Sequence, residues 1–272
     1  MRRRSVEGSS EKVKDFKSYE VYSKYRVPEE LAFFVRCNGR NFRKVCSLLE
    51  LRKPFDERLI RTLVKASREV LQGGFNAILA YMFSDEVNFL FFKDVPFNRR
   101  IEKLVSLIPS LLSSRLTLEI LRLFDREITV SFDARIIPLH VNEIIDYLVW
   151  RQLQCFRNCL NCYAHYSLIE AGHDPQRASE VLRGRRAKEL IRLLRKVKGI
   201  KLSDIPLWER RGVLLYWKFF YRNSNYRLVK GKTLKRKREL KEEWNLPVFS
   251  RLEGRAFLQR VLKSWIEVEQ RG

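Results

Sequence analysis

Two apolar runs separated by three polar residues restrict the fold of this chain more than any other feature. The runs cover residues 78–83 and 87–92, and Ser84-Asp85-Glu86 lies between them. Apolar segments joined by a short polar connection are typical of a β-hairpin. This hairpin would carry two carboxylates at its tip. A further apolar run, residues 31–35, ends shortly before the polar stretch Asn38-Gly39-Arg40-Asn41-Phe42, so a second strand is also expected to end in a polar loop.

The order of the segments predicts a split βαβ arrangement. Strands are expected at 31–37, 76–83, 87–93 and 127–132, and helices at 55–73, 98–122 and 141–171. Pro109 is expected to kink or interrupt the second of these helices. The β-α-β-β-α-β order is the ferredoxin-like topology of a palm. The fold class expected is α+β: a polymerase-type palm with a ferredoxin-like βαββαβ core, an antiparallel sheet with helices on one face, and a helical C-terminal part.

The second half of the chain is expected to be mainly helical. Helices are predicted at 175–183, 185–198 and 252–270, a strand at 212–220, and an exposed basic hairpin or loop at 221–245. The chain is accordingly divided into three parts. These are a charged N-terminal segment (1–27), a palm-type catalytic domain with a helical extension (28–220), and a basic loop with a C-terminal helix (221–272).

The charge of the chain points to a polyanionic partner. Lys and Arg number 55 against 32 Asp and Glu, so the net charge is +23 and the pI is about 10.1. RNA, DNA and an anionic membrane surface are the candidates. A solvated charged surface is the alternative, but it usually balances lysine with glutamate. Nucleic acid is therefore favoured. The basic residues peak at 230–238.

No membrane partner or secretory route is expected. No apolar run reaches the ~18–20 residues of a bilayer span. The basic start of the chain has no apolar region after it, unlike a secretory signal. The five cysteines are an odd number, which favours reduced thiols in a cytoplasmic protein. Three of them share one helix face (Cys155, Cys159 and Cys162), where apolar packing is favoured over a metal site.

Palm domains hold divalent metals where the end of one strand faces a hairpin that carries carboxylates. Two metals about 3.5–4 Å apart can clamp the attacking and leaving oxygens of a phosphoryl transfer. Asn38 stands where this chemistry expects aspartate, and an amide oxygen ligates Mg²⁺ without contributing charge. Weak metal binding and a low rate are therefore expected. For Asp85 the alternative is a turn aspartate that caps the hairpin. Strand alternation would point Glu86 to the opposite face.

Seven blocks of the sequence, in order between residues 30 and 220, resemble the tRNA-His guanylyltransferase family and its relatives, the template-dependent 3′–5′ tRNA nucleotidyltransferases. The blocks are Asn38-Gly39-Arg40-Asn41-Phe42, Lys53-Pro54-Phe55-Asp56-Glu57-Arg58, Ser84-Asp85-Glu86, residues 97–103, Phe132-Asp133-Ala134-Arg135, residues 146–152 and residues 212–218. Two positions depart from the family pattern. Asn38 replaces an aspartate, and the His-x-Asn-Asn signature reads Phe156-Arg157-Asn158-Cys159. The second departure favours the relatives with broader tRNA repair activity.

The resemblance implies a set of site residues and ligands. It implies catalytic roles for Asp85, Asn38 and Glu86, and metal ligation of two Mg²⁺ ions by Asn38, Gly39 and Asp85. It implies nucleotide binding by Gly39, Arg40, Asn41, Phe42, Lys53, Asp56, Ser84 and Lys103, and tRNA or triphosphate binding by Arg99, Arg100, Arg151, Gln152 and Asn158. For the lysines, ordinary surface charge is the alternative. ATP and GTP would be substrates, tRNA the partner, and a homotetramer the assembly.

The function expected is 3′–5′ nucleotide transfer to a tRNA 5′ end. As the resemblance implies, ATP or GTP would activate the 5′ phosphate, and the 3′-OH of GTP or of a templated nucleotide would then attack it. Two alternatives stay open. One is a catalytically impaired palm-fold tRNA-binding pseudoenzyme, because of Asn38. The other is a polymerase or nucleotide cyclase of the same topology, which would form product without an RNA acceptor.

Overall fold

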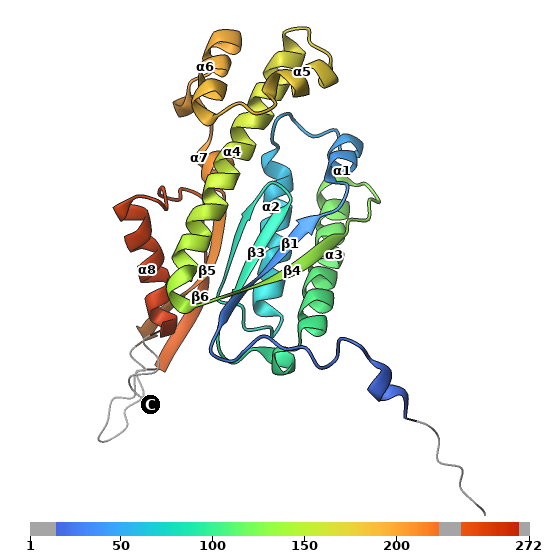
Figure 1. Ribbon diagram of the computed structural model, residues 1–272, viewed down its shortest axis with the longest axis vertical. Helices are drawn as coiled ribbons and strands as arrows, with labels where there is room; N and C mark the ends of the chain where they lie inside the picture. The colour runs from blue at the N-terminus through green and yellow to red at the C-terminus, as the bar shows by residue number, and fades with distance from the viewer. Residues whose placement is uncertain (1–14, 223–234, 267–272) are drawn as a thin grey trace, which may run out of the picture.

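One antiparallel six-stranded sheet organises the molecule. The computed structural model describes residues 15–222 and 235–266. The strand order is β4-β1-β3-β2-β5-β6, and every neighbouring pair is antiparallel (Figure 1). The strands are β1 (Ala32–Gly39), β2 (Leu79–Phe83), β3 (Glu86–Phe91), β4 (Phe132–Leu139), β5 (Val213–Arg222) and β6 (Lys235–Glu243).

Helices cover both faces of this sheet. Helices α2 (Glu57–Gln72) and α3 (Ile101–Phe124) lie on one face, and α4 (Ile144–Glu170) and α8 (Leu252–Ile266) lie on the other (Figure 1). Short helix α1 (Phe42–Leu48) follows β1. Helices α5 (Pro175–Leu182), α6 (Ala187–Lys198) and α7 (Leu207–Arg211) contact α4. Four 3₁₀ turns complete the described elements: Phe16–Tyr19, Pro96–Arg99, Val141–Glu143 and Leu202–Asp204.

The ferredoxin-like core is confirmed. Its four strands stand in the order β4-β1-β3-β2, with α2 between β1 and β2 and α3 between β3 and β4. Strand alternation separates two apolar layers. Phe33, Val35 and Cys37 of β1 face α2 and α3, whereas Ala32 and Phe34 face α4. In this core α2 and α3, the two helices that connect the strands, lie on one face of the sheet, as expected. Helices α4 and α8 cover the other face.

The strand expected at 127–132 is wrong in position. Residues 127–131 are irregular, and β4 begins only at Phe132. Val130 is buried like a strand residue, but its amide donates a hydrogen bond to Thr117 Oγ1 at 3.2 Å rather than to another strand. The alternating pattern therefore marks buried residues, although these residues do not pair with a neighbouring strand. Pro109 lies inside α3 and does not end it.

The C-terminal part contains strands as well as helices. Strand β5 confirms the expected strand at 212–220, and it pairs with β6 from Leu214↔Glu243 to Arg222↔Lys235. The predicted basic hairpin therefore has two paired arms, while residues 223–234 and part of the basic run at 230–238 lie outside the described residues. Because β6 pairs with β5, the sheet runs across the expected boundary at 220, and the three-part division stays a prediction.

Helix α3 qualifies by length and composition as a membrane span, with a mean hydropathy of 1.5 over its most apolar window. This differs from the expectation that no segment would qualify. One face of α3 packs into the core of the described structure through Leu104, Ile108, Leu112, Leu116 and Ile120, all fully buried. The core helix of a soluble protein meets the same criterion.

We predict that Gly254→Ala will loosen α8 from the sheet. A Cβ on Gly254 would overlap the carbonyl oxygen of Val248, so the helix must shift away from residues 248 and 249. We expect a loss of roughly 1–3 kcal/mol in the free energy of unfolding, measured by urea denaturation. Gln259→Ala, at an exposed position of the same helix, is the control and should change stability little. Equal stability of the Gly254→Ala and control proteins would contradict this packing.

Candidate active site

The end of β1 and the tip of the β2–β3 hairpin are joined by the backbone. The amide of Gly39 donates a hydrogen bond to the carbonyl of Asp85 at 2.9 Å. One residue earlier, Asn38 stands directly opposite Glu86 in the β1–β3 ladder. The structure therefore brings the backbones of Asn38, Gly39 and Asp85, the three residues expected to hold metal, to one end of the sheet.

Position 39 accepts only glycine without rearrangement. A Cβ there would overlap the ring of Phe42, the first residue of α1. That ring is buried and stands 5.3 Å from the ring of Phe132, measured between centroids. Close packing of Phe42 over Gly39 thus fixes α1 against the strand end. The space left by the missing side chain at Gly39 is filled by the protein's own aromatic ring.

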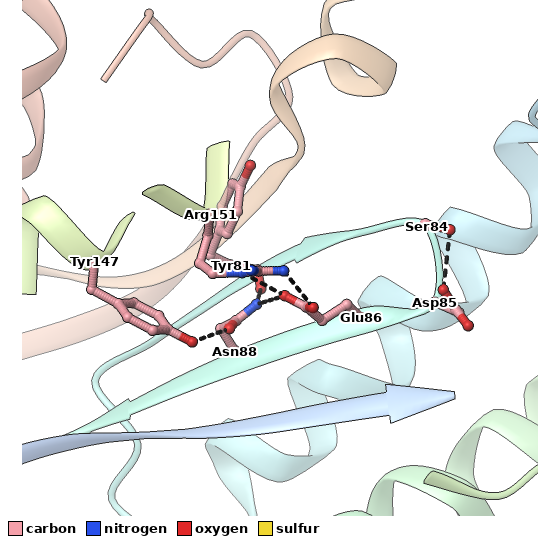
Figure 2. A network of polar contacts seen from close by, with 7 residues as sticks. All are labelled: Tyr81, Ser84, Asp85, Glu86, Asn88, Tyr147 and Arg151. Carbon is pink, nitrogen blue, oxygen red and sulfur yellow. Dashed lines mark hydrogen bonds and ion pairs between the residues drawn. The ribbon is translucent and has the colours of Figure 1, made fainter. Parts of the chain in front are cut away.

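Asp85 lies in the turn of the β2–β3 hairpin. Ser84, at a φ of 52°, forms the turn, and its hydroxyl donates to Asp85 Oδ1 at 3.1 Å (Figure 2). Burial raises the pKa of the Asp85 carboxyl. After burial, the largest influence on the pKa of Cys162 is the charge of Asp85, which raises it, so this carboxylate lies near α4. Asp85 also raises the pKa of Cys46 on α1.

Two basic side chains border the same space. Lys53 and Arg43 both lower the pKa of Cys162, against the larger effect of burial. Lys53 Nζ lies 5.8 Å from the centroid of the Tyr166 ring on α4. Asn158 is also close, because its Oδ1 accepts a weak hydrogen bond from the Cys162 thiol at 3.8 Å. Lys53 and Asn158 therefore stand where a triphosphate beside Asp85 could reach them.

The loop between β1 and α1 offers fewer free amides than expected. The amide of Arg40 donates to the carbonyl of Ser131 at 2.8 Å, so it is already used. Asn41 has a left-handed backbone (φ 56°) and begins α1 without a side-chain cap. Within the described residues, the amides of Asn41 and Phe42 have no acceptor. These two, rather than Arg40, are the backbone donors open to a phosphate.

Glu86 forms a buried ion pair, and its expected catalytic role stays a prediction. Its carboxylate is buried and paired with Arg151, with Nη2–Oε2 at 2.5 Å and Nε–Oε1 at 2.9 Å (Figure 2). Asn88 Nδ2 also donates to Glu86 Oε1 at 2.8 Å, and Tyr147 Oη donates to Asn88 Oδ1 at 2.6 Å. Arg151 is therefore held inside the protein by Glu86, and its expected contact with tRNA or triphosphate stays a prediction.

Two other expected ligand contacts are replaced by internal bonds. Asp56 caps α2 by accepting from the amide of Arg58 at 2.9 Å, and it also accepts from the amide of Arg52 at 3.0 Å. Gln152 bridges α4 to the C-terminal segment by donating to Pro247 O at 3.0 Å and accepting from the amide of Phe249 at 2.7 Å. Both side chains are buried and hold the fold together.

The basic residues before α3 lie at the other end of the sheet. Arg99 is buried, and its guanidinium donates to the carbonyls of Val27 and Leu31, just before β1 begins. Arg100 and Lys103 follow it at the start of α3. Since β1 runs the whole sheet from Ala32 to Gly39, these three are not brought to Asp85 within one chain. Arg99, Arg100 and Lys103 are close to the hairpin in sequence, but this closeness does not show at which end of the sheet they lie.

Asp133, for which the sequence predicts no role, is placed beside Asn38 by the sheet. Asn38 stands opposite Asp133 in the β1–β4 ladder and opposite Glu86 in the β1–β3 ladder. Directly opposed residues point to the same face of a sheet. Asp133 is exposed and lies 3.6 Å from Arg135. Arg43 and Cys46 were likewise missed, because only the position of α1 shows that they border Asp85.

Comparisons with known proteins identify the family of this chain. The family model described as tRNAHis guanylyltransferase matches residues 11–140, and the model described as Thg1 C terminal domain matches residues 142–249. This chain belongs to the tRNAHis guanylyltransferase family. A tRNA(His) guanylyltransferase of Candida glabrata is 30% identical over 75% of this chain and 88% of that protein. A probable tRNA(His) guanylyltransferase of Drosophila melanogaster is 32% identical over 66% of this chain, and the match spans 65% of that protein.

Solved structures show the same fold. A bacterial tRNA(His) guanylyltransferase-like protein in complex with ATP superposes with a TM-score of 0.69 at 21% identity, covering 90% of this chain and 96% of that one. The same description applies to a GTP complex with a TM-score of 0.66 at 19% identity, covering 91% of this chain and 96% of that one. The family has a nucleotidyltransferase activity that adds a guanylate to the tRNA 5′ end. The palm fold expected from the sequence is thereby confirmed.

We predict that Glu86→Ala will strongly destabilise the protein. Removing one partner of a buried ion pair leaves Arg151 charged without compensation, which typically costs about 3–5 kcal/mol. The double variant Glu86→Leu/Arg151→Met, which removes both charges, should recover much of this loss. Urea denaturation of the three proteins is the measurement. Glu180→Ala, at an exposed ion pair with Arg177, is the control and should cost less than about 1 kcal/mol.

We predict an acid-sensitive contribution to stability from Asp56. The hydrogen bonds from the Arg58 side chain lower the pKa of Asp56 to about 2, against the effect of burial. Because the pKa is lower in the folded state, this contribution is present above the ordinary value near 4 and is lost as the pH falls toward 2. The urea midpoint of the unaltered protein should therefore fall more steeply between about pH 4 and pH 2 than that of Asp56→Asn. Parallel curves would contradict this assignment.

Proposed function

We propose that this chain transfers nucleotides in the 3′–5′ direction to the 5′ end of a tRNA. The observation that carries the proposal is the meeting of Asn38, Gly39 and Asp85 at one end of a palm sheet in a member of this family. GTP or a templated nucleotide is added after ATP or GTP has activated the 5′ phosphate. A tRNA that already carries a 5′ triphosphate needs no activation.

The residues at this end suit a hard divalent cation such as Mg²⁺. The donors are the Asp85 carboxylate, the Asn38 side-chain oxygen and the Gly39 carbonyl, and Mg²⁺ prefers such oxygen ligands. Asp85 is half-buried with Ser84 as its hydrogen-bond partner, and desolvation raises its pKa, so a cation would compensate its charge. No group of three His, Cys, Asp or Glu suited to a metal occurs in the described part of the chain. Two bound ions would neutralise charge on the transferring phosphate.

The chain's own residues position the triphosphate. Lys53 and Arg43 supply positive charge beside Asp85, and the amides of Asn41 and Phe42 supply hydrogen-bond donors at the start of α1. Catalysis of phosphoryl transfer depends mainly on such positioning and charge neutralisation. The 3′-OH of the incoming nucleotide attacks the activated 5′ phosphate, and the activating group leaves.

The charge of the chain supports tRNA as the partner. A net charge of +23 favours binding to phosphates, and such binding weakens steeply with added salt. The ATP and GTP complexes of the bacterial neighbours support nucleoside triphosphates as substrates. A homotetrameric assembly and a cytoplasmic location remain part of the proposal.

Asn38 favours a second candidate function, a tRNA-binding pseudoenzyme. With an amide at position 38, Asp85 is the one carboxylate among the three proposed ligands, so two divalent cations would repel each other with little compensation. The two functions differ in whether any nucleotide transfer remains.

We predict that Asn38→Asp will raise nucleotide addition at saturating Mg²⁺ by about 10- to 100-fold, equivalent to roughly 1.4–2.7 kcal/mol of transition-state stabilisation. The assay follows labelled GTP joined to a tRNA that lacks its 5′-most nucleotide. Asp85→Asn should reduce addition to background, while exposed Glu180→Ala, far from the site in sequence, should leave it unchanged.

The outcomes separate the candidates. No gain in Asn38→Asp would show that the metal assignment is wrong. Inactivity of the unaltered chain together with retained tRNA binding would identify the pseudoenzyme. Product formed equally well without tRNA would instead indicate a polymerase or cyclase.

A further inference from the structure

The groove between α2 and α3 is lined mainly by charged side chains. The two helices lie side by side on the face of the sheet opposite α4 (Figure 1). The groove has a volume of about 380 Å³, which is within the range of small-ligand sites. Its charged lining consists of Lys65, Arg68, Arg115, Arg122, Glu69 and Glu119. We call this surface the α2–α3 groove.

Positive charge exceeds negative charge in the α2–α3 groove. Four basic residues line it against two acidic ones. Arg68 also pairs with Glu242 of β6, where Nη2 and Oε1 are 2.6 Å apart. With this third acid counted, the cations still outnumber the acids by four to three. The groove therefore favours an anionic ligand.

Two of the ion pairs in the groove are long. Lys65 Nζ lies 3.5 Å from Glu119 Oε2, and Arg115 Nη2 lies 3.4 Å from Glu69 Oε2. Both distances exceed the usual length of a hydrogen bond between charged groups, about 2.7–2.9 Å. Ion pairs at the surface contribute little to stability. An anion can therefore replace these two contacts at small cost.

Three arginines give the groove donors that suit phosphate. Arg68, Arg115 and Arg122 each contact a carboxylate through one terminal nitrogen, and their side chains are 33%, 42% and 66% exposed. A guanidinium carries five N–H donors, so most of them remain available to a ligand. Its planar fork binds two phosphate oxygens at once, which the ammonium group of lysine does not do.

Helical spacing arranges these cations in two rows. On α3, Arg115 and Arg122 are separated by two turns, which is about 10.5 Å along the helix axis. On α2, Lys65 and Arg68 are three positions apart and are neighbours on one side of the helix. A single phosphate is too small to contact both ends of such rows. A chain of linked phosphates can follow them.

We propose that the α2–α3 groove binds linked phosphate groups, supplied by an RNA backbone or by a free polyphosphate. The cation excess attracts the charge, the guanidinium forks match the oxygens, and the two rows match a chain of phosphates. Asn158 and Cys162, which lie near Asp85, belong to α4 on the other face of the sheet. The groove is thus separate from the candidate active site, and the inference does not rest on the proposed function.

Removing two of the arginines tests the site directly. Arg115→Gln/Arg122→Gln should weaken the binding of tripolyphosphate or of a polyuridine RNA about 10-fold or more, because charge-assisted hydrogen bonds are lost. Isothermal titration calorimetry measures the tripolyphosphate, and fluorescence anisotropy measures the labelled RNA. Both measurements are made at about 0.15 M salt, with EDTA present to remove divalent cations.

The matched control removes the same charge elsewhere. Arg177→Gln/Lys198→Gln takes two cations from exposed ion pairs on α5 and α6, with Glu180 and Glu170 respectively. This variant should change either affinity less than about 3-fold. Urea denaturation shows whether both double variants are folded.

Arginine footprinting on the unaltered protein locates the ligand without any substitution. Hydroxyphenylglyoxal modifies accessible guanidinium groups, and mass spectrometry reports the extent of modification at each arginine. Bound ligand should protect Arg68, Arg115 and Arg122, whereas Arg177 should react as before.

The two ligands distinguish the sources of phosphate. Protection by the RNA alone assigns the groove to an RNA backbone, and protection by tripolyphosphate alone assigns it to a free polyphosphate. Protection by both supports the shared phosphate chemistry. The proposal is overturned if neither ligand protects the three arginines, or if the folded groove variant binds both ligands as tightly as the control variant.

Discussion

The hydrogen bond from the amide of Gly39 to the carbonyl of Asp85 is the constraint on which the candidate site depends. It closes the β1–β3 ladder at the point where both strands leave the sheet. A slip of one residue in this ladder would move Asn38 to the face covered by α2 and α3. Register therefore decides which residue of β1 stands beside the hairpin tip. The packing of Phe42 over Gly39 then fixes α1 as the wall beside them.

Two adjacent carboxylates have opposite roles because one lies in the turn and the other in the strand. Asp85 lies in the turn, and its charge raises the pKa of Cys162 on α4, whereas the charges of Arg43 and Lys53 lower it. Glu86 begins β3 and is buried against Arg151 (Figure 2). That ion pair ties α4 to the sheet, and α4 in turn carries Asn158 and Cys162 to the Asp85 side. A residue that looks catalytic by its position in a motif thus supports the site through the fold.

The order of elements in the palm could be predicted from the sequence, because long apolar patterns at strand and helix periods mark β1, α2, the hairpin and α4. Strand β4 was misplaced because burial of Val130 mimics a strand, although its amide bonds to a side chain. Strand alternation already indicated that Glu86 points away from Asp85. The partner Arg151 lies 65 residues further along the chain, and no local pattern reveals such a pair. Arg99 and Lys103 follow the hairpin closely in sequence, but the length of β3 carries them to the far end of the sheet.

The central claim is that Asn38, Gly39 and Asp85 form a site for divalent cations. Titration with Mn²⁺, followed by the relaxation rate of solvent water protons, measures this binding without any turnover. The account predicts saturable binding that weakens strongly in Asp85→Asn and tightens in Asn38→Asp. Binding that is unchanged in both variants would contradict the account.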